Sequence, residues 1–174
     1  MHTLTAAAVQ MVSGTHPETN IDTMRRLVRQ AAERGADWVL LPEYWPLMGA
    51  RDTDKLAFAE PLGAGAFQTA MSEIARECNI VLFGGTVPLQ SGEAGKVLNT
   101  LLVYGRDGAP IGAYDKMHLF GYSGLGERYA EADTIAALGV DAGAHDRLVG
   151  VLTIDDVVDI IREQAEHQAL GAAG

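Results

Sequence analysis

The sequence has little of the residue types that cross-link a fold or coordinate a metal. Its 174 residues contain one cysteine and five scattered histidines. One cysteine cannot form an intramolecular disulfide, and neither paired Cys-x-x-Cys arms nor a His-x-x-x-His spacing is present to hold zinc. We therefore expect no disulfide framework, no metal site and no cofactor. A chain of this length buries roughly 70% of its unfolded surface, which is enough for a core without such cross-links.

Basic residues and long apolar runs are also scarce. Thirteen Lys and Arg stand against 23 Asp and Glu, for a formal net charge of -10. Such a charge repels phosphate backbones and anionic lipid headgroups, which argues against nucleic acid and membrane partners. The longest nearly apolar stretches, 4–12 and 79–88, are far shorter than the roughly 20 residues of a membrane helix. We therefore expect a soluble, cytoplasmic protein.

What the chain does contain is an alternation of short apolar runs and helical periodicities, typical of an α/β fold. The runs predict buried strands over 4–12, 38–41 and 80–83. Apolar residues three or four apart predict a helix before each later strand, one through Ile21, Met24, Val28 and Ala31 and the other through Phe67, Met71, Ile74 and Cys78.

A hairpin is predicted next in the chain. Residues 97–104 and 110–114 are extended segments on either side of Arg106-Asp107-Gly108, and Asp-Gly favours the backbone of a tight turn. The glycine-rich run 121–126 that follows predicts a loop.

Three motifs along this alternation carry a family resemblance: Ala8-Val9-Gln10-Met11, Leu41-Pro42-Glu43-Tyr44 and Tyr114-Asp115-Lys116-Met117-His118-Leu119-Phe120. With them, residues 3–135 resemble the N-terminal half of a carbon-nitrogen hydrolase of the nitrilase superfamily. The resemblance implies an α/β fold that is a truncated four-layer α-β-β-α sandwich. It also implies a small amide or nitrile as substrate, most like the omega-amidase branch.

The same resemblance implies roles for three residues. Glu43 would be the general base, Lys116 the cation beside the tetrahedral intermediate, and Glu131 the second carboxylate. The chemistry suits these residue types, because a nucleophilic thiol must lose a proton to a nearby base. A fixed ammonium then stabilises the negative charge that develops on the substrate.

The nucleophile is where the sequence departs from the family pattern. The family's cysteine follows a further strand after the second Glu, whereas this chain has no cysteine after Cys78. Cys78 occupies an apolar position of a predicted helix, which favours a buried and inert thiol. Ser123 lies in Gly121-Tyr122-Ser123-Gly124-Leu125, which lacks the second glycine of a nucleophile elbow and is interpreted as a loop. We therefore expect a hydrolase by descent that is inactive as this chain, or alternatively a non-catalytic partner of a full-length hydrolase.

The C-terminal part differs in character from the rest. Residues 140–168, and above all 146–161, resemble the closing strand and helix of a CBS domain, so the sequence predicts a nitrilase-like partial domain over 1–139 and a CBS-like fragment over 140–174. The resemblance places contacts to the ribose of an adenosyl ligand on Thr153 and Asp156, although both residues are also good helix caps. A regulatory module that binds such a ligand is thus a third functional hypothesis.

The truncation has a consequence for association. A sheet built to be covered by a second sheet leaves an apolar face exposed, and soluble domains rarely tolerate large patches of this kind. We therefore expect a homo-oligomer.

Overall fold

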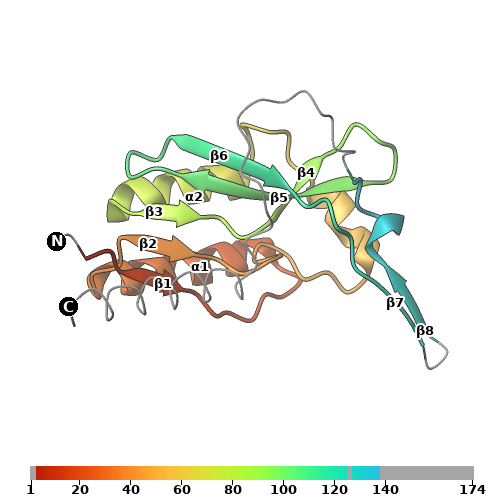
Figure 1. Cartoon of the computed structure of the whole chain (residues 1–174), viewed down its shortest axis with the longest axis horizontal. Coiled ribbons are helices and arrows are strands. Elements are labelled where there is room, and N and C mark those ends of the chain that lie inside the picture. The colour runs from red at the N-terminus through yellow and green to blue at the C-terminus, as the bar shows by residue number, and fades with distance from the viewer. Residues whose placement is uncertain (1–2, 125–126, 138–174) are drawn as a thin grey trace, which may run out of the picture. The chain divides into compact units, whose positions relative to one another are not determined.

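The computed structural model describes residues 3–124 and 127–137, and a mixed β-sheet is the centre of this part (Figure 1). The strands run in the order β1-β2-β3-β5-β4, and β6, which lies off this order, also pairs with β5. Their bounds are β1 Ala6–Ala8, β2 Trp38–Leu40, β3 Val81–Phe83, β4 Val87–Gln90, β5 Val97–Tyr104 and β6 Pro110–Asp115. The strands β1, β2 and β3 are parallel, and the pairs involving β5 are antiparallel.

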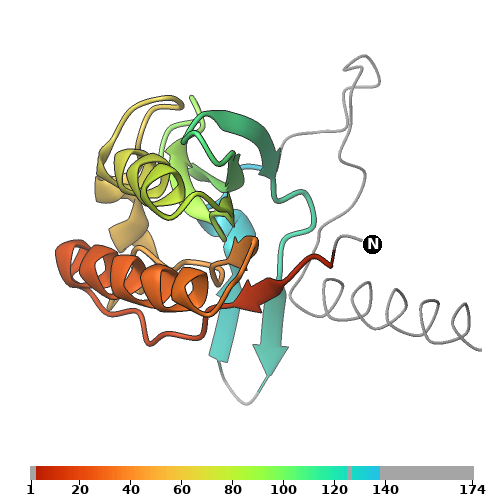
Figure 2. The same ribbon diagram turned by 90° about the vertical axis from the view of Figure 1, so that its left-hand side faces the viewer.

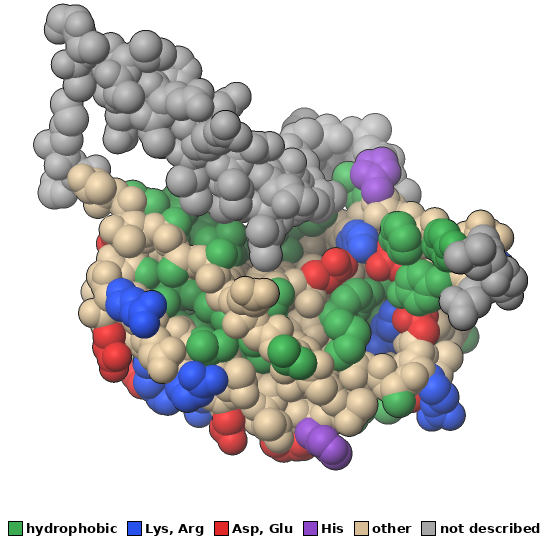
Figure 3. Space-filling view, turned by 90° about the horizontal axis from the view of Figure 1, so that it is seen from below, with side chains coloured by type: hydrophobic (Ala, Val, Ile, Leu, Met, Phe, Trp, Pro, Cys, Tyr) green, Lys and Arg blue, Asp and Glu red, His purple; other side chains and the backbone are tan. Residues whose placement is uncertain are grey.

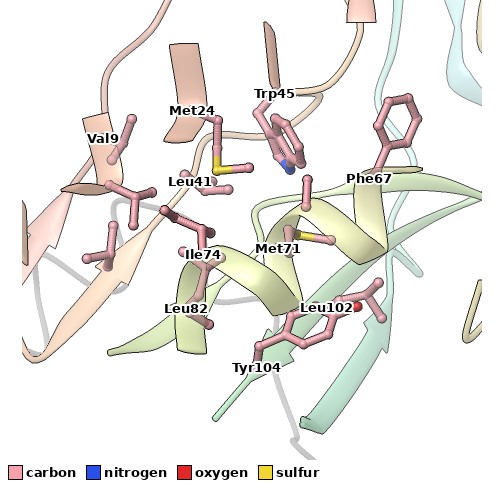
Figure 4. Packing of buried hydrophobic residues seen from close by; sticks show 14 of the residues in the cluster. Val9, Met24, Leu41, Trp45, Phe67, Met71, Ile74, Leu82, Leu102 and Tyr104 are labelled. Carbon is pink, nitrogen blue, oxygen red and sulfur yellow. The ribbon is translucent and has the colours of Figure 1, made fainter. Parts of the chain in front are cut away.

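Two helices, α1 (Pro17–Glu33) and α2 (Ala66–Cys78), lie on the same side of this sheet (Figure 2). Each carries an apolar stripe at helical spacing, and the two stripes meet the sheet in one core (Figure 4). The core includes Met24 and Val28 of α1, Met71 and Ile74 of α2, and Val39, Leu82 and Leu102 of the strands. Packing against the two helices therefore holds β2 and β3 in place, and with them the start of the segments that follow these strands.

Most of the predicted elements are confirmed, with shorter bounds for the first strand. Both helices, the strands in 38–41 and 80–83, and the hairpin of β5 and β6 form as the patterns indicate. The run 4–12 contributes only the three residues of β1 to the sheet, although Val9 N–H still donates to Leu40 O at 2.8 Å.

The predicted loop over 121–126 is wrong for residues 121–124, while 125–126 lie outside the described residues. Gly121–Gly124 forms β7 and Glu127–Ala130 forms β8, and the two pair as an antiparallel hairpin. A 3-10 helix, η2 (Glu131–Asp133), follows β8 directly. Glycines marked this segment as a turn, but pairing with the polar and aromatic residues of β8 makes it extended.

The connection after β3 brings two chain segments unusually close. Gly85 has φ +52, and a Cβ added there would lie 2.1 Å from Pro42 O. Trp45 is fully buried and donates from its ring nitrogen Nε1 to Gly84 O at 2.9 Å. Only a glycine allows this approach, which fixes the chain on both sides of Glu43.

The face of the sheet opposite to α1 and α2 carries further apolar side chains. Trp38 of β2 and Phe83 of β3 lie on it with ring centroids 5.5 Å apart, and Trp38 remains partly exposed. Figure 3 shows hydrophobic side chains at the surface, together with a group of acidic and basic ones.

None of the helices in the described ranges is long and apolar enough to cross a bilayer. Within residues 3–124 and 127–137 there is likewise no group of three or more His, Cys, Asp or Glu side chains arranged to hold a metal ion. The predicted boundary at 139 and the CBS-like segment with Thr153 and Asp156 lie outside these ranges.

Candidate active site

The structure brings together the three side chains that the family resemblance singled out. Lys116 Nζ donates to Glu43 Oε1 at 2.9 Å and to Glu131 Oε1, also at 2.9 Å. Glu43 follows β2, Lys116 follows β6, and Glu131 begins η2 after the β7–β8 hairpin. Three separate elements thus converge on one ammonium group.

The Glu43 segment is held by the backbone around it. Leu41 N–H donates to Phe83 O at 2.9 Å, which continues the pairing of β2 with β3 up to the edge of the site. Tyr44 has φ +54, a left-handed conformation that is uncommon for a residue with a large side chain. Its N–H donates to Thr86 Oγ1 at 3.0 Å, and this bond helps to hold the sharp turn directly after Glu43.

Asn99 of β5 is a site residue that sequence reasoning missed. Its Nδ2 donates to Glu43 Oε1 at 2.8 Å, and its side chain is almost wholly buried. Its backbone oxygen accepts from Lys116 N–H at 2.9 Å, so the β5–β6 pairing continues as far as Lys116. The signal was an amide side chain in a strand that is apolar apart from Asn99 and Thr100, where a buried polar group needs a hydrogen-bonding partner.

Glu131 is the most buried of the three charged groups, with a side chain only 5% exposed. Its Oε2 accepts from Phe120 N–H at 2.6 Å, and its own N–H donates to Phe120 O at 3.0 Å. One carboxylate oxygen therefore contacts an ammonium and the other a backbone amide, which compensates for the loss of water around the charge.

The charge balance makes Lys116 a stable cation. Burial alone would lower its pKa, but hydrogen bonds to Glu131 and Glu43 outweigh burial and raise the pKa above its ordinary value. Two carboxylates surround one ammonium, so the three groups carry a formal net charge of -1. The cluster can accept one proton without becoming positive.

The two oxygens of Glu43 differ in their surroundings. Oε1 accepts from both Lys116 and Asn99, whereas Oε2 has no hydrogen-bond partner among the residues that the structure describes. The side chain is 48% exposed, so Oε2 is open to an incoming molecule. The geometry suits an acceptor that is held by one oxygen and takes a proton on the other.

A buried hydroxyl group lies in the same region. Tyr44 Oη is buried and has no hydrogen-bond partner in the described part of the chain. Burial, followed by the charges of Glu131 and Glu43, raises the pKa of this phenol, which therefore stays protonated.

Neither of the other candidate nucleophiles lies with this cluster. Cys78 is the last residue of α2, three residues before β3 begins, whereas Glu43 lies beyond the carboxyl end of the parallel strand β2. It is partly buried against the core, less deeply than its helical position predicted. Burial and the charge of Glu77 raise the pKa of the thiol. Ser123 is an exposed residue of β7 opposite Arg128, in a strand and not in the predicted loop.

Known proteins are similar to this chain in sequence. The family described as "Carbon-nitrogen hydrolase" matches residues 5–157. The chain is 36% identical over 115 residues to the omega-amidase NIT2 of Homo sapiens, covering 66% of this chain and 40% of that protein. The corresponding protein of Xenopus tropicalis is 32% identical over 130 residues, covering 74% and 45%. The chain thus spans less than half the length of these relatives.

Solved structures show the same fold. The NitFhit protein of C. elegans superposes with a TM-score of 0.63 at 25% identity, over 79% of this chain and 34% of that one. An amidase from Nesterenkonia sp. superposes with a TM-score of 0.64 at 20% identity, over 78% of this chain and 48% of that one. The mixed α/β architecture predicted from the sequence is confirmed by these likenesses.

Proposed function

Because the chain belongs to the carbon-nitrogen hydrolase family, we propose that Glu43, Lys116 and Glu131 form the site at which it binds a small amide. The observation that carries the proposal is the position of Lys116 Nζ, 2.9 Å from one oxygen of each carboxylate. An ammonium held in this way is a preorganised partner for the oxygen of a carbonyl group. The similarity to omega-amidases favours short amides that carry a second polar group.

In this proposal Lys116 polarises the substrate. The carboxylates of Glu43 and Glu131 keep the ammonium charged and fix its direction, so little reorganisation is needed when charge develops on the carbonyl oxygen. Removing one such donor from an acyl-transfer site raises the activation barrier by about 3 kcal/mol. Glu131 is nearly buried and acts through Lys116 as a fixed counter-charge.

Glu43 acts as the proton acceptor. Its Oε1 is held by Lys116 and Asn99, whereas its Oε2 has no hydrogen-bond partner among the described residues, and the side chain is 48% exposed. A carboxylate with one oxygen restrained and one accessible has the geometry that a general base needs. The proton would come from a nucleophile above the carbonyl carbon of the bound amide.

Within residues 3–124 and 127–137, neither Cys78 nor Ser123, the two candidate nucleophiles, lies at the cluster. The one cysteine of the sequence, Cys78, is the last residue of α2, which leads to the opposite end of the parallel strands. Water activated by Glu43 attacks an amide far more slowly than a thiolate does. We therefore propose that the 174-residue chain binds short amides and does not turn them over.

The test measures binding and turnover in the same samples. Amide binding is followed by chemical-shift changes of the Lys116 and Asn99 signals on titration with short aliphatic amides and omega-amides, and ammonia release is measured in parallel. Glu43→Gln and Lys116→Gln should weaken binding at least about tenfold, the loss of one charged hydrogen bond. Glu93→Gln, in an exposed turn away from the site, is the matched control.

Two results would overturn the proposal. If the signals of the cluster do not move with any amide, the site does not have the proposed ligand. If ammonia is released and Glu43→Gln abolishes that release, the chain is an active hydrolase with a nucleophile that we have not identified.

A further inference from the structure

A second charged pair, Asp52 and Lys55, lies outside the proposed amide site and contacts both of its carboxylate segments. Both residues belong to the 3-10 helix η1 (Asp52–Phe58), which lies between β2 and α2 in the sequence. Lys55 Nζ contacts Asp52 Oδ1 at 2.6 Å, and Lys55 is buried even though it is a lysine. Burying a charged pair has a large desolvation cost, so the pair needs compensating contacts.

The contacts of Asp52 lead to the Glu131 segment. Tyr129 Oη donates to Asp52 Oδ1 at 3.3 Å, and Thr134 Oγ1 donates to Asp52 Oδ2. Tyr129 precedes Glu131 by two residues and Thr134 follows it by three. The Asp52 carboxylate therefore accepts hydrogen bonds from the chain on both sides of Glu131. Figure 1 shows the 3-10 helix that precedes α2 beside the segment that leaves β8.

The contacts of Lys55 lead to the Glu43 segment. Its Nζ lies 5.1 Å from the centre of the Tyr44 ring, within the range of a cation–π interaction. Tyr44 is the residue directly after Glu43 and has the left-handed backbone described above. The ammonium of Lys55 therefore contacts the ring of Tyr44, the residue whose backbone conformation orients Glu43.

We infer that Asp52 and Lys55 are positioning residues that hold Glu131 and Glu43 around Lys116. The inference rests on the proposed function of that cluster. Neither residue contacts Lys116, so each acts through a neighbour of a site carboxylate. The pair joins two segments that the sheet alone leaves separate, because β2 and the β7–β8 hairpin belong to different sheets.

The pKa of Lys116 reports whether its two carboxylate partners are in place, since their hydrogen bonds raise it. This quantity separates positioning from simple charge effects. Removing the cation of Lys55 would, through the electric field alone, raise the pKa of Lys116 further. If Lys55 holds Glu43 and Glu131 in place, the same removal lowers that pKa, because the partners move away.

The experiment follows the 13Cε signal of Lys116 against pH in the full chain, in Lys55→Gln and in Thr134→Val. Thr134→Val keeps the shape and the charge and removes only the donor to Asp52. We expect the Lys116 pKa to fall in both variants. Lys96→Gln, which breaks the equivalent (i,i+3) pair with Glu93 in an exposed turn, should leave it unchanged.

A rise in the Lys116 pKa in Lys55→Gln, or no change in folded Thr134→Val, overturns the inference. If Lys55→Gln does not fold, Thr134→Val decides the outcome alone. The readout does not depend on catalysis or binding. Failure of the chain to bind amides would therefore overturn the proposed function and leave this result standing.

Discussion

Glu60 is a buried carboxylate whose removal should strongly destabilise the fold. It lies before α2 and is 8% exposed, and a bridge to Leu89 connects its backbone to β4. Its Oε1 accepts from Phe67 N–H at 2.7 Å, and its Oε2 accepts from Gln68 N–H at 3.2 Å and from Gln68 Nε2 at 3.1 Å. Phe67 and Gln68 are in the first turn of α2, whose N-cap is Gly65. Glu60 thus supplies the capping acceptor that a glycine cannot.

The magnitude follows from these contacts. A hydrogen bond to a charged group contributes about 1.5–3 kcal/mol, and an anion at a helix N-terminus contributes up to about 2 kcal/mol. Because contributions within one network do not add, we expect Glu60→Ala to lower the free energy of unfolding by about 3 kcal/mol. Glu60→Gln keeps one acceptor oxygen and should lose roughly half as much.

Urea unfolding followed by circular dichroism measures both variants. The midpoint should fall with little change in the slope, because the surface exposed on unfolding stays the same. Glu93→Ala, which removes an exposed carboxylate paired with Lys96, is the control and should cost less than about 1 kcal/mol. A loss below about 1 kcal/mol in Glu60→Ala would refute the idea that this carboxylate caps α2.

Three further predictions concern the backbone, the thiol and association. Gly85→Ala should lower the free energy of unfolding by about 3 kcal/mol or more, because the alanine Cβ would lie 2.1 Å from Pro42 O. The control Gly92→Ala, also at positive φ but in open space, should lower it by about 1 kcal/mol. Equal thermal unfolding midpoints of the two variants would contradict the close approach. Cys78 should react with a thiol reagent more slowly in the native chain than in urea, because burial raises its pKa, and equal rates would show that the thiol is not protected. Light scattering should show dimers or larger species that bind a hydrophobic dye at micromolar concentration, whereas a dye-silent monomer would mean that the apolar face is already covered.

The elements that the sequence predicted are those whose signals are local. The apolar spacing of α1 and α2 and the Asp-Gly turn between β5 and β6 each lie within one segment, so each could be read without the rest of the chain. The strand β4 and the 3-10 helix η1 were missed, because they depend on partners elsewhere: β4 pairs with β5, and η1 is anchored through Asp52 to Thr134.

The site shows the same division. The family motifs singled out Glu43, Lys116 and Glu131, but no periodicity could place Glu43 beside a lysine 73 residues away. Asn99 was missed because the strand holds two adjacent polar residues, Asn99 and Thr100, and the sequence does not indicate which of them contacts Glu43. The contact of Asn99 with Glu43 depends on the register of β5 against β6, which places the Asn99 backbone opposite Lys116.

That register also determines which insertions and deletions the chain can accept. Asn99 lies in β5 and Lys116 directly follows β6, and Lys116 N–H donates to Asn99 O, so the hairpin carries both donors to Glu43 as one piece. A residue inserted in the exposed turn 92–95 lengthens a loop and leaves this piece intact. A residue inserted within 112–115 turns Lys116 to the opposite face of the sheet, because side chains alternate along a strand. Length variation among descendants of this sequence should therefore be tolerated before β5 and eliminated within β6, even though both segments lie near the surface.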